Sequence, residues 1–175
     1  MNINRLFLPL SNPEILKLKA GEIYYLNGIV YTARDQAHQK LFYYIKSKNR
    51  LPFKIKTNCI YYCGPTPKRQ NQVIGSCGPT TSSRMDSYTP ILLEKGFKIF
   101  IGKGKRSEEV LSSIVKNKGV YFTTIGGAGA FLSTKVKKCK VIFYKELASE
   151  AIHELELKDF PAVVSIDSKG RSIFN

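Results

Sequence analysis

The sequence has few acidic residues, few cysteines and no long apolar run, and each shortage excludes a class of protein. None of its apolar stretches is long or pure enough to cross a bilayer. The apolar run near the start is too short for a secretory signal, and Pro9 interrupts it. We therefore expect a cytoplasmic protein with no membrane segment. A chain of 175 residues is long enough for a sizeable core, and we expect one domain over residues 1–175.

The shortage of acidic residues leaves a strongly basic chain, with 28 Lys and Arg against 13 Asp and Glu and a net charge of +15. Such a balance can indicate nucleic-acid binding. Here, however, lysines dominate and are scattered, and the densest run lies at residues 135–140. No recognition-helix pattern, zinc-finger spacing or aromatic RNA-binding signature accompanies them. We expect no nucleic-acid partner, and a lysine-rich surface that is solvated or faces an acidic partner.

The four cysteines are Cys59, Cys63, Cys77 and Cys139. Disulfides are not expected in a cytosolic chain, so metal binding and packing are the two alternatives. An iron–sulfur cluster needs three or four thiolates. Cys59 lies in an apolar run where strand alternation points it away from its near neighbour Tyr62. We therefore interpret all four as buried or local thiols and expect no metal site in this chain.

Strand-like and helix-like segments alternate from residue 57 onward, which predicts a parallel sheet with crossover helices. Near the start, residues 22–26 and 29–32 read as two strands joined at Asn27-Gly28, the strongest short signal for a hairpin. The periodicity thus predicts a mixed α/β protein. The other expected strands are residues 3–8, 60–63, 97–101, 120–123, 136–144 and 160–166, and the expected helices include 13–18, 34–46, 85–94, 107–115 and 146–155.

Residues 75–90 read GSCGPTTSSRMDSYTP and form the most unusual stretch of the chain. Gly78-Pro79 predicts a turn, and the hydroxyl run that follows leads into Arg84. If a helix begins near Ser82, its free N–H groups, the hydroxyl groups and the guanidinium face the same space, as in an anion site. The alternative is an ordinary loop capped by a serine or threonine.

Two further polar clusters follow expected strands. Residues 32–38 read TARDQAH and contain Arg34, Asp35 and His38, and Lys103 lies on a glycine hinge after residues 97–101. In open α/β sheets, ligands bind at the carboxyl ends of the strands. We therefore expect residues 32–38, residues 78–84 and Lys103 to converge on one pocket that is open to solvent.

Together these clusters resemble the small (β) subunit, or C-terminal domain, of the class I iron–sulfur hydro-lyases. The resemblance extends in order from residue 32 to residue 170, and its motifs are TARDQAH, YYCGPTP, GSCGPTTSSRMDSYTP, IGKGKRSEE, GGAGA, EAIHELE and DFPAVVSIDSKG. It implies a swivelling three-layer β/β/α domain, with a mainly parallel sheet and a smaller antiparallel sheet.

The resemblance implies the β subunit of a class I fumarate hydratase, which hydrates fumarate reversibly to L-malate in the tricarboxylic acid cycle. It also implies an α subunit that carries a [4Fe–4S] cluster in an α2β2 heterotetramer, so that this chain binds no cofactor and is inactive alone. One alternative is the β subunit of L(+)-tartrate dehydratase, which converts tartrate to oxaloacetate. A non-enzyme alternative is a basic binding or regulatory module on the same scaffold.

Site roles follow from this chemistry. Arginine matches a carboxylate with two parallel hydrogen bonds, so the predicted substrate-binding residues are Arg34 and Arg84, with Lys103 as a point charge beside them. In the resembled family a threonine transfers the proton at carbon, which here implies Thr80, with Thr81 as the fallback. A nearby arginine, a helix N-terminus or carboxylates of the partner could activate that hydroxyl.

The remaining candidates stand around these groups. Asp35 and Asp86 each neighbour an arginine in sequence and are interpreted as residues that orient it. His38 lies one helical turn after Arg34 and either assists the site or is structural. Gly78 is kept as a possible member of the site. His153 is expected on a helix, in packing or at the surface. We expect Tyr61, Tyr62 and Tyr88 to form an aromatic surface that faces the α subunit.

Overall fold

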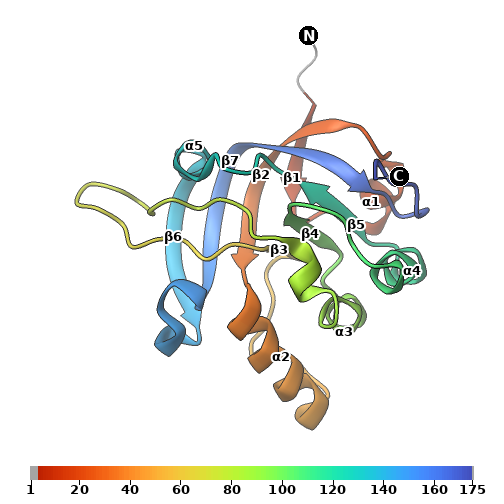
Figure 1. The fold of residues 1–175 in the computed structure, drawn as a ribbon, viewed down its shortest axis with the longest axis horizontal. Coiled ribbons are helices and arrows are strands. Elements are labelled where there is room, and N and C mark those ends of the chain that lie inside the picture. Colours follow the sequence, from red (N-terminus) through yellow and green to blue (C-terminus); the bar gives the residue numbers. More distant parts are fainter. Residues whose placement is uncertain (1–3, 175) are drawn as a thin grey trace.

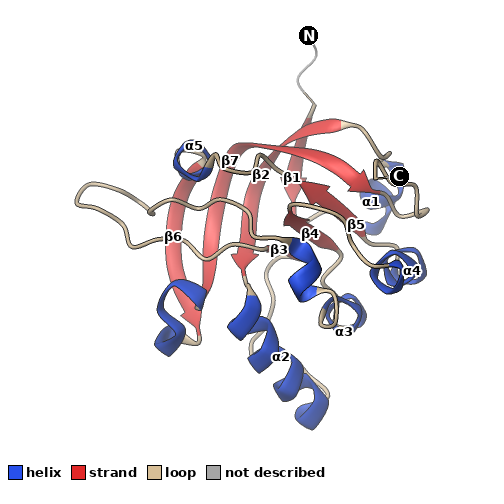
Figure 2. Ribbon diagram, in the orientation of Figure 1, coloured by secondary structure: helices blue, strands red, loops and turns tan. Residues whose placement is uncertain are grey.

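The computed structural model describes residues 4–174, and helices and strands alternate through them (Figures 1 and 2). This alternation confirms the mixed α/β class that the sequence predicts. No helix in the described range is long and apolar enough to span a membrane. The strands are β1 (Arg5–Leu8), β2 (Ile23–Thr32), β3 (Cys59–Tyr61), β4 (Ile99–Gly102), β5 (Val120–Thr123), β6 (Val136–Phe143) and β7 (Ile152–Ile166). The α-helices are α1 (Asn12–Lys17), α2 (Asp35–Lys48), α3 (Thr89–Glu94), α4 (Glu108–Asn117) and α5 (Gly129–Ser133), and the 3₁₀ helices are η1 (Ser82–Met85) and η2 (Lys145–Glu150).

The strands form one sheet in the order β1-β2-β3-β4-β5-β7-β6, with an additional pairing between β2 and β7. That pairing joins β2, β3, β4, β5 and β7 into a closed ring, while β1 and β6 extend the sheet outside it. Strands β1 to β5 pair in parallel, and β7 is antiparallel to β2, β5 and β6.

This ring differs from the expected three layers with a separate antiparallel sheet. The physical reason is the length of β7, which has 15 residues and pairs with three strands. Figure 1 shows it as the long blue strand that curves past β6 and β2 and continues to β5. Since β7 belongs to both the parallel and the antiparallel parts, the two parts are one continuous sheet.

Residues of the ring strands alternate between two hydrophobic clusters. On β3 and β4, Cys59, Tyr61, Ile99 and Ile101 belong to the cluster inside the ring. Their neighbours in the chain, among them Phe100, belong to the cluster under α2, α3 and α4. The period of two that defines a strand therefore separates an inner core from a helix-covered outer core. The expectation that Cys59 and Tyr62 lie in different layers is confirmed.

The predicted hairpin at Asn27-Gly28 is wrong, because β2 continues through both residues. The pairing of β2 with β7 shifts its register between Leu26 and Gly28, so the pair of turn residues forms an irregularity within a strand. Gly28 has a φ of +107°, and a Cβ there would lie 2.5 Å from the carbonyl oxygen of Leu8 on β1. The glycine is therefore required by a bulge and by a close neighbouring backbone rather than by a turn.

The predicted helix over residues 146–155 is also wrong. Its first part is the short η2, which contains Ala148 at a positive φ of 52°, and its second part is the beginning of β7. The segment from Glu154 to Leu157 alternates between polar and apolar residues, and β7 pairs there with both β2 and β6. Pairing on both sides stabilises the strand over the helix, and it places His153 on β7.

Candidate active site

Backbone hydrogen bonds bring the polar clusters together at one edge of the sheet. The amide N–H of Ala33, just after β2, donates to the carbonyl of Tyr61 at 3.1 Å. The N–H of Thr80 donates to the carbonyl of Tyr62 at 2.8 Å. Lys103 directly follows β4, the next strand in the sheet. The parallel strands β2, β3 and β4 thus end side by side, and their carboxyl ends carry the three predicted clusters.

Asp35, at the start of α2, lies between the two arginines. Its Oδ2 atom accepts a hydrogen bond from Nε of Arg34 at 3.1 Å and forms an ion pair with Nη2 of Arg84, also at 3.1 Å. The same Nη2 atom donates to the hydroxyl of Thr80 at 2.9 Å. The side chains of Arg34 and Arg84 remain 28% and 47% exposed. Both guanidinium groups therefore lie close together and are accessible to a ligand, whereas the expected pocket around them and Lys103 stays a prediction.

Thr81 and Lys103 are joined by their backbones rather than by their side chains. Thr81 forms an isolated parallel bridge with Lys103. The next residue, Ser82, donates its N–H to the carbonyl of Lys103 at 3.0 Å and accepts from the N–H of Lys103 at 3.1 Å through its hydroxyl. The hydroxyl of Tyr121 in turn donates to Ser82 at 2.9 Å. Ser82 therefore fixes Lys103 beside the threonine pair.

His38 lies behind Arg34 and does not enter the exposed cluster. Its side chain is buried, and its Nδ1 atom is 2.9 Å from the carbonyl oxygen of Arg34. Because a carbonyl only accepts, Nδ1 carries the proton. The ring packs against Tyr62 and Tyr88, and burial lowers its pKa to about 4. The geometry favours the structural alternative for His38, as a neutral ring that supports the first turn of α2.

Asp86 does not contact Arg84, its neighbour in sequence. Its carboxylate accepts from Nε of Arg106 at 2.7 Å and from the N–H of Ser107 at 2.7 Å. Ser107 is the residue that caps α4. Asp86 does orient an arginine, as predicted, but this arginine is Arg106, and Asp86 also ties η1 to the beginning of α4.

Arg106 is a residue that the sequence analysis missed. Its side chain is 0% exposed, and its guanidinium lies between the rings of Tyr62 and Tyr121 at 5.2 and 4.9 Å. It donates to Thr89 at 2.7 Å and to the hydroxyl of Tyr62 at 3.3 Å. Burial acts to lower its pKa, but Tyr62 and Asp86 outweigh that effect and raise it. In sequence Arg106 ends a run of cations, and that position gives no sign of burial.

Glu150 is the second missed residue. Its Oε2 atom accepts from the N–H of Gln36 at 2.8 Å, which satisfies a free donor in the first turn of α2. Its Oε1 atom lies 3.6 Å from Nε of Arg34. Sequence reasoning placed Glu150 in a helix, where no partner could be assigned to it. In the structure it connects η2 with the arginine that follows β2.

The remaining predicted residues lie around the cluster. Gly78 lies against α5, where a Cβ on it would be 3.4 Å from Cα of Gly129. Tyr61 and Tyr62 are both fully buried, so the expected aromatic surface is wrong for them, and only Tyr88 is partly exposed. Tyr61 belongs to the inner core and Tyr62 to the outer core, because strand alternation points them to opposite sides.

The described cysteines do not fit an iron–sulfur cluster. Within residues 4–174, no group of three or more His, Cys, Asp or Glu side chains could hold a metal ion. Cys59, Cys63 and Cys77 are buried in the inner core, and Cys139 is partly buried on β6. Burial raises the pKa of Cys59 well above its ordinary value, which disfavours the thiolate that a metal needs. A cluster held by a partner subunit stays a prediction.

The cluster of Arg34, Arg84 and Thr80 has the chemical groups needed to bind an anion and to transfer a proton. Two guanidinium groups on one face can each bind a carboxylate with charge-assisted hydrogen bonds. Arg84 also donates to the hydroxyl oxygen of Thr80, and such a bond stabilises that oxygen when it loses its proton. The lysine next to this pair adds positive charge at the same edge. The described residues can therefore hold a carboxylate next to a hydroxyl that exchanges a proton.

Known proteins resemble this chain over most of its length. A family model described as Fumarase C-terminus matches residues 1–175. The putative L(+)-tartrate dehydratase subunit beta of Methanocaldococcus jannaschii is 40% identical over 174 residues, which cover 96% of this chain and 89% of that protein. The class I aerobic fumarate hydratase of Escherichia coli (strain K12) is 40% identical over 151 residues, which cover 85% of this chain. Fumarate hydratase 2 of Leishmania major is 35% identical over 93% of this chain. The matched region spans only 28% and 29% of these two hydratases.

Proposed function

The chain belongs to the Fumarase C-terminus family, and from that membership we propose that it is the β subunit of a class I fumarate hydratase. In this proposal it hydrates fumarate reversibly to L-malate together with an α subunit, and it is inactive alone. The observation that carries the proposal is the contact network of Thr80, Arg84, Asp35 and Arg34. It holds two carboxylate-binding groups and one hydroxyl on a single exposed face.

Carboxylate binding is the first task of this chain. Fumarate and L-malate each carry two carboxylates. Negative charge builds on one of them when the neighbouring carbon of malate loses its proton, and the same charge builds in the reverse direction before that carbon is protonated. The carboxylate contacts of Arg34 within residues 4–174 use its Nε atom, so its two terminal Nη groups are available to substrate. Asp35 holds both guanidinium groups in place, and Lys103 adds a further cation.

Proton transfer is the second task, and we assign it to Thr80. Its hydroxyl receives a hydrogen bond from Arg84, and its backbone is fixed to Tyr62. A positioned side chain that moves a proton contributes typically about 10² to 10⁴ in rate. Thr81 is the neighbouring hydroxyl and remains the fallback. Among the described residues, the carboxylate linked to Thr80 is that of Asp35, which reaches it only through Arg84 and is already paired with two arginines.

The partner is part of the proposal. The α subunit would carry a [4Fe–4S] cluster, and an open iron on such a cluster supplies a Lewis acid for the substrate hydroxyl. We propose an α2β2 heterotetramer in the cytoplasm, in which this domain swivels against the α subunit. The relative from Methanocaldococcus jannaschii, named as a subunit beta and matched over 89% of its length, supports the division into subunits.

A second candidate activity is the dehydration of L(+)-tartrate to oxaloacetate. It is favoured by the name of that same relative. Tartrate differs from malate by a second hydroxyl, and the residues that read it can belong to the α subunit. The two candidates therefore share the roles assigned here to Arg34, Arg84 and Thr80.

One experiment decides between the candidates. The chain is purified with its α subunit under anaerobic conditions, and fumarate, L-malate and L(+)-tartrate are each supplied as the only substrate. We expect conversion between fumarate and malate, no activity from either subunit alone, and co-migration of the two chains in size exclusion. Conversion of tartrate alone would establish the second activity. A loaded complex that converts none of these substrates would leave the basic binding module as the better reading.

A further inference from the structure

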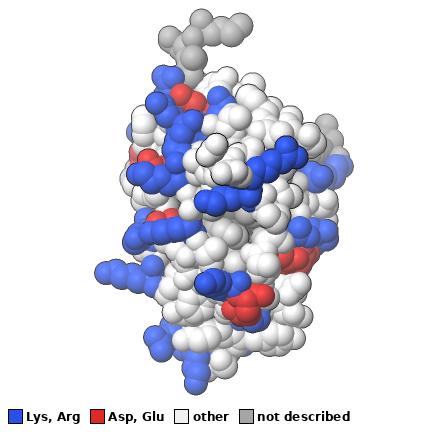
Figure 3. Space-filling view, turned by 90° about the vertical axis from the view of Figure 1, so that its left-hand side faces the viewer, with Lys and Arg blue, Asp and Glu red and all other residues white. Residues whose placement is uncertain are grey.

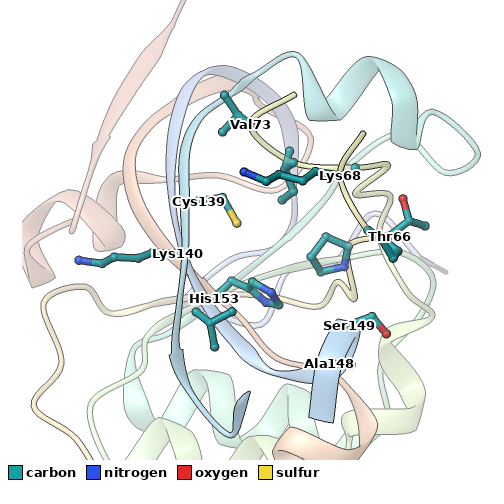
Figure 4. Close-up of a pocket in the computed structure, with 13 residues that line it drawn as sticks. Thr66, Lys68, Val73, Cys139, Lys140, Ala148, Ser149 and His153 are labelled. Atoms are coloured by element: carbon teal, nitrogen blue, oxygen red, sulfur yellow. The ribbon is translucent and has the colours of Figure 1, made fainter. Parts of the chain in front are cut away.

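A pocket of about 390 Å³ lies between β6, the beginning of β7 and the loop that follows β3 (Figure 4). This volume lies within the range of about 300 to 1,000 Å³ typical of small-molecule sites. Neither Arg34 nor Thr80 nor Arg84 lines it. The pocket is therefore separate from the proposed active site, and no role described above accounts for it.

Most of the pocket wall is apolar. The loop contributes Pro65, Pro67, Val73 and Ile74, and β6 contributes Val141 from the opposite side. An aromatic or aliphatic body about the size of a benzene ring can pack between these two walls. Burial of apolar surface contributes about 25 cal/mol per Å². The shape and the composition of the wall thus favour a compact apolar group over a dicarboxylate.

The charges that line the pocket are both positive. Lys68 and Lys140 belong to its lining, and no acidic residue does. Figure 4 shows Lys68 stretching above Cys139, whereas Lys140 points away, and Lys140 pairs with Glu154 at 2.9 Å. Figure 3 views the molecule from the side of β6 and the loop, and Lys and Arg outnumber Asp and Glu on that face. An anion is therefore attracted to this side, with Lys68 as its nearest cation.

His153 supplies an uncharged polar group at the base of the pocket. Its Nδ1 atom is 2.9 Å from the carbonyl oxygen of Ala151, so Nδ1 carries the proton, and Thr32 lies 3.1 Å from the same atom. Burial also lowers the pKa of His153, which favours the neutral ring. The other ring nitrogen, Nε2, is then an acceptor. A ligand hydroxyl fits that acceptor, while a carboxylate fits Lys68.

We propose that this pocket binds a compact hydroxy acid with an apolar body, such as an aromatic hydroxycarboxylate. The apolar body packs between Val73 and Val141, the carboxylate faces Lys68, and the hydroxyl donates to His153. This binding does not depend on the proposed hydratase activity, because the site shares no lining residue with the arginine cluster.

Arg34 does not line the pocket, but it lies beside two residues that directly neighbour the pocket lining in the chain. Ser149 lines the pocket, and the next residue, Glu150, contacts Arg34. Pro65 lines it from the other side, and a Cβ on the preceding Gly64 would lie 2.6 Å from Cδ of Arg34. An occupant that moves either wall therefore changes the surroundings of that arginine.

Titration of the isotope-labelled chain with 4-hydroxybenzoate, followed by amide NMR shifts, tests the proposal. We expect saturable shifts at Val73, Val141 and His153, with smaller shifts at Gly64 and Glu150. The methyl ester, which lacks the negative charge, should bind about fivefold more weakly, the size of one exposed ion pair. Benzoate, which lacks the hydroxyl, should also bind more weakly.

Variants of residues that line the pocket, each paired with a control outside it, test whether the ligand binds at this place. Lys68→Gln should weaken binding about fivefold, whereas Arg69→Gln removes the adjacent charge and should leave it unchanged. Val141→Trp should abolish binding by filling the pocket, and Val115→Trp, at an exposed valine of α4, serves as its control. Folding of each variant is checked by its thermal midpoint.

Three results would overturn the proposal. The first is that millimolar 4-hydroxybenzoate causes no saturable amide shifts, and the second is that Lys68→Gln and Arg69→Gln weaken its binding equally. The third is that the shifts are confined to residues of the arginine cluster. Arg84→Met separates the last case from the hydratase proposal. That variant should lose substrate turnover and keep the pocket shifts.

Discussion

Two arginine clusters meet at η1, one through Arg84 within it and the other through Asp86 directly after it. They differ in how many of their hydrogen-bond donors the protein itself satisfies. Arg106 is fully buried, and Asp86, Thr89 and two tyrosine rings surround it. Arg34 and Arg84 are partly exposed and share the single carboxylate of Asp35. A guanidinium has five donors. Each of the three nitrogens of Arg106 donates a hydrogen bond inside the protein, while the exposed cluster keeps donors for a ligand.

The two clusters are connected by contacts, so the buried cluster can position the exposed one. Arg106 packs on Tyr121, and Tyr121 donates to Ser82, which fixes the backbone of Lys103. Asp86, one residue beyond η1, is bound to Arg106. The buried arginine therefore positions the segment that carries Thr80 and Arg84, and we expect it to act on stability, whereas the exposed arginine acts on substrate.

The largest effect on stability is expected from the replacement Arg106→Met, which tests the structural role of the buried cluster. It leaves Asp86 without its buried partner, and losing one member of a buried pair costs about 3 to 5 kcal/mol. Chemical denaturation of the chain measures the free energy of unfolding. Arg5→Met is the matched control, because Arg5 pairs with Asp159 in an exposed contact that contributes at most about 1 kcal/mol. Equal losses in the two variants would contradict the structural role of Arg106.

The buried region should also show a pH dependence of its stability, because it contains His38. His38 has its pKa lowered to about 4 in the fold, against an ordinary value of 6.5. As the pH falls, His38 of the unfolded chain therefore takes up a proton before His38 of the folded chain does. The neutral ring's contribution to the free energy of unfolding is fully present above about pH 6.5 and decreases towards pH 4. The loss amounts to about 3 kcal/mol, since one pKa unit corresponds to about 1.4 kcal/mol.

NMR titration of the His38 ring measures this directly, and denaturation at several pH values measures its effect on stability. His38→Phe keeps a ring between the tyrosines and should remove this part of the slope. A ring that titrates near 6.5 would show that His38 is accessible and belongs to the exposed cluster instead.

In the exposed cluster, the largest effect is expected from Thr80→Val. The change keeps the shape of the side chain and removes its hydroxyl, so kcat of the reconstituted enzyme should fall about 100-fold or more while KM barely changes. Exchange of the substrate C–H proton with deuterated solvent should fall in parallel. Thr81→Val is the control. If that variant loses turnover and Thr80→Val does not, the fallback residue is the base.

A smaller loss of activity is expected from Arg84→Lys, which keeps the positive charge but removes the planar guanidinium group that can form two parallel hydrogen bonds. One lost charge-assisted hydrogen bond should lower kcat/KM by about 10- to 100-fold. Arg69→Lys, at an exposed arginine outside the cluster, is the matched control. Unfolding free energy should stay within about 0.5 kcal/mol of the parent chain, because surface substitutions have effects of that size. If Arg84→Lys lowered the free energy of unfolding as much as Arg106→Met does, the exposed arginine would also be structural, which would contradict the distinction between the two clusters.

Local sequence signals predicted those parts of the fold and site that depend on neighbouring residues. The strand at Ile99, the helix capped by Ser107 and the position of Arg34 just after a strand all follow from short patterns. The segments that were predicted wrongly depend on distant strands. Asn27-Gly28 reads as a turn until β1 and β7 are placed beside it. Likewise, nothing near Asp86 in the chain shows that Arg106 is its partner, because the pair forms only when α4 packs beside η1.

The closure of the ring by β2 and β7 has a consequence for how the chain acquires its structure. Thr32 and His153, which meet across that pairing, are 121 positions apart in the chain. Contacts between distant segments form slowly, because a long loop must be ordered first. During synthesis, the edge of β2 that pairs with β7 emerges without its partner and is exposed to wrong pairing until the last strand follows. Glu150 arrives equally late, so the surroundings of Arg34 are completed among the last features of the fold.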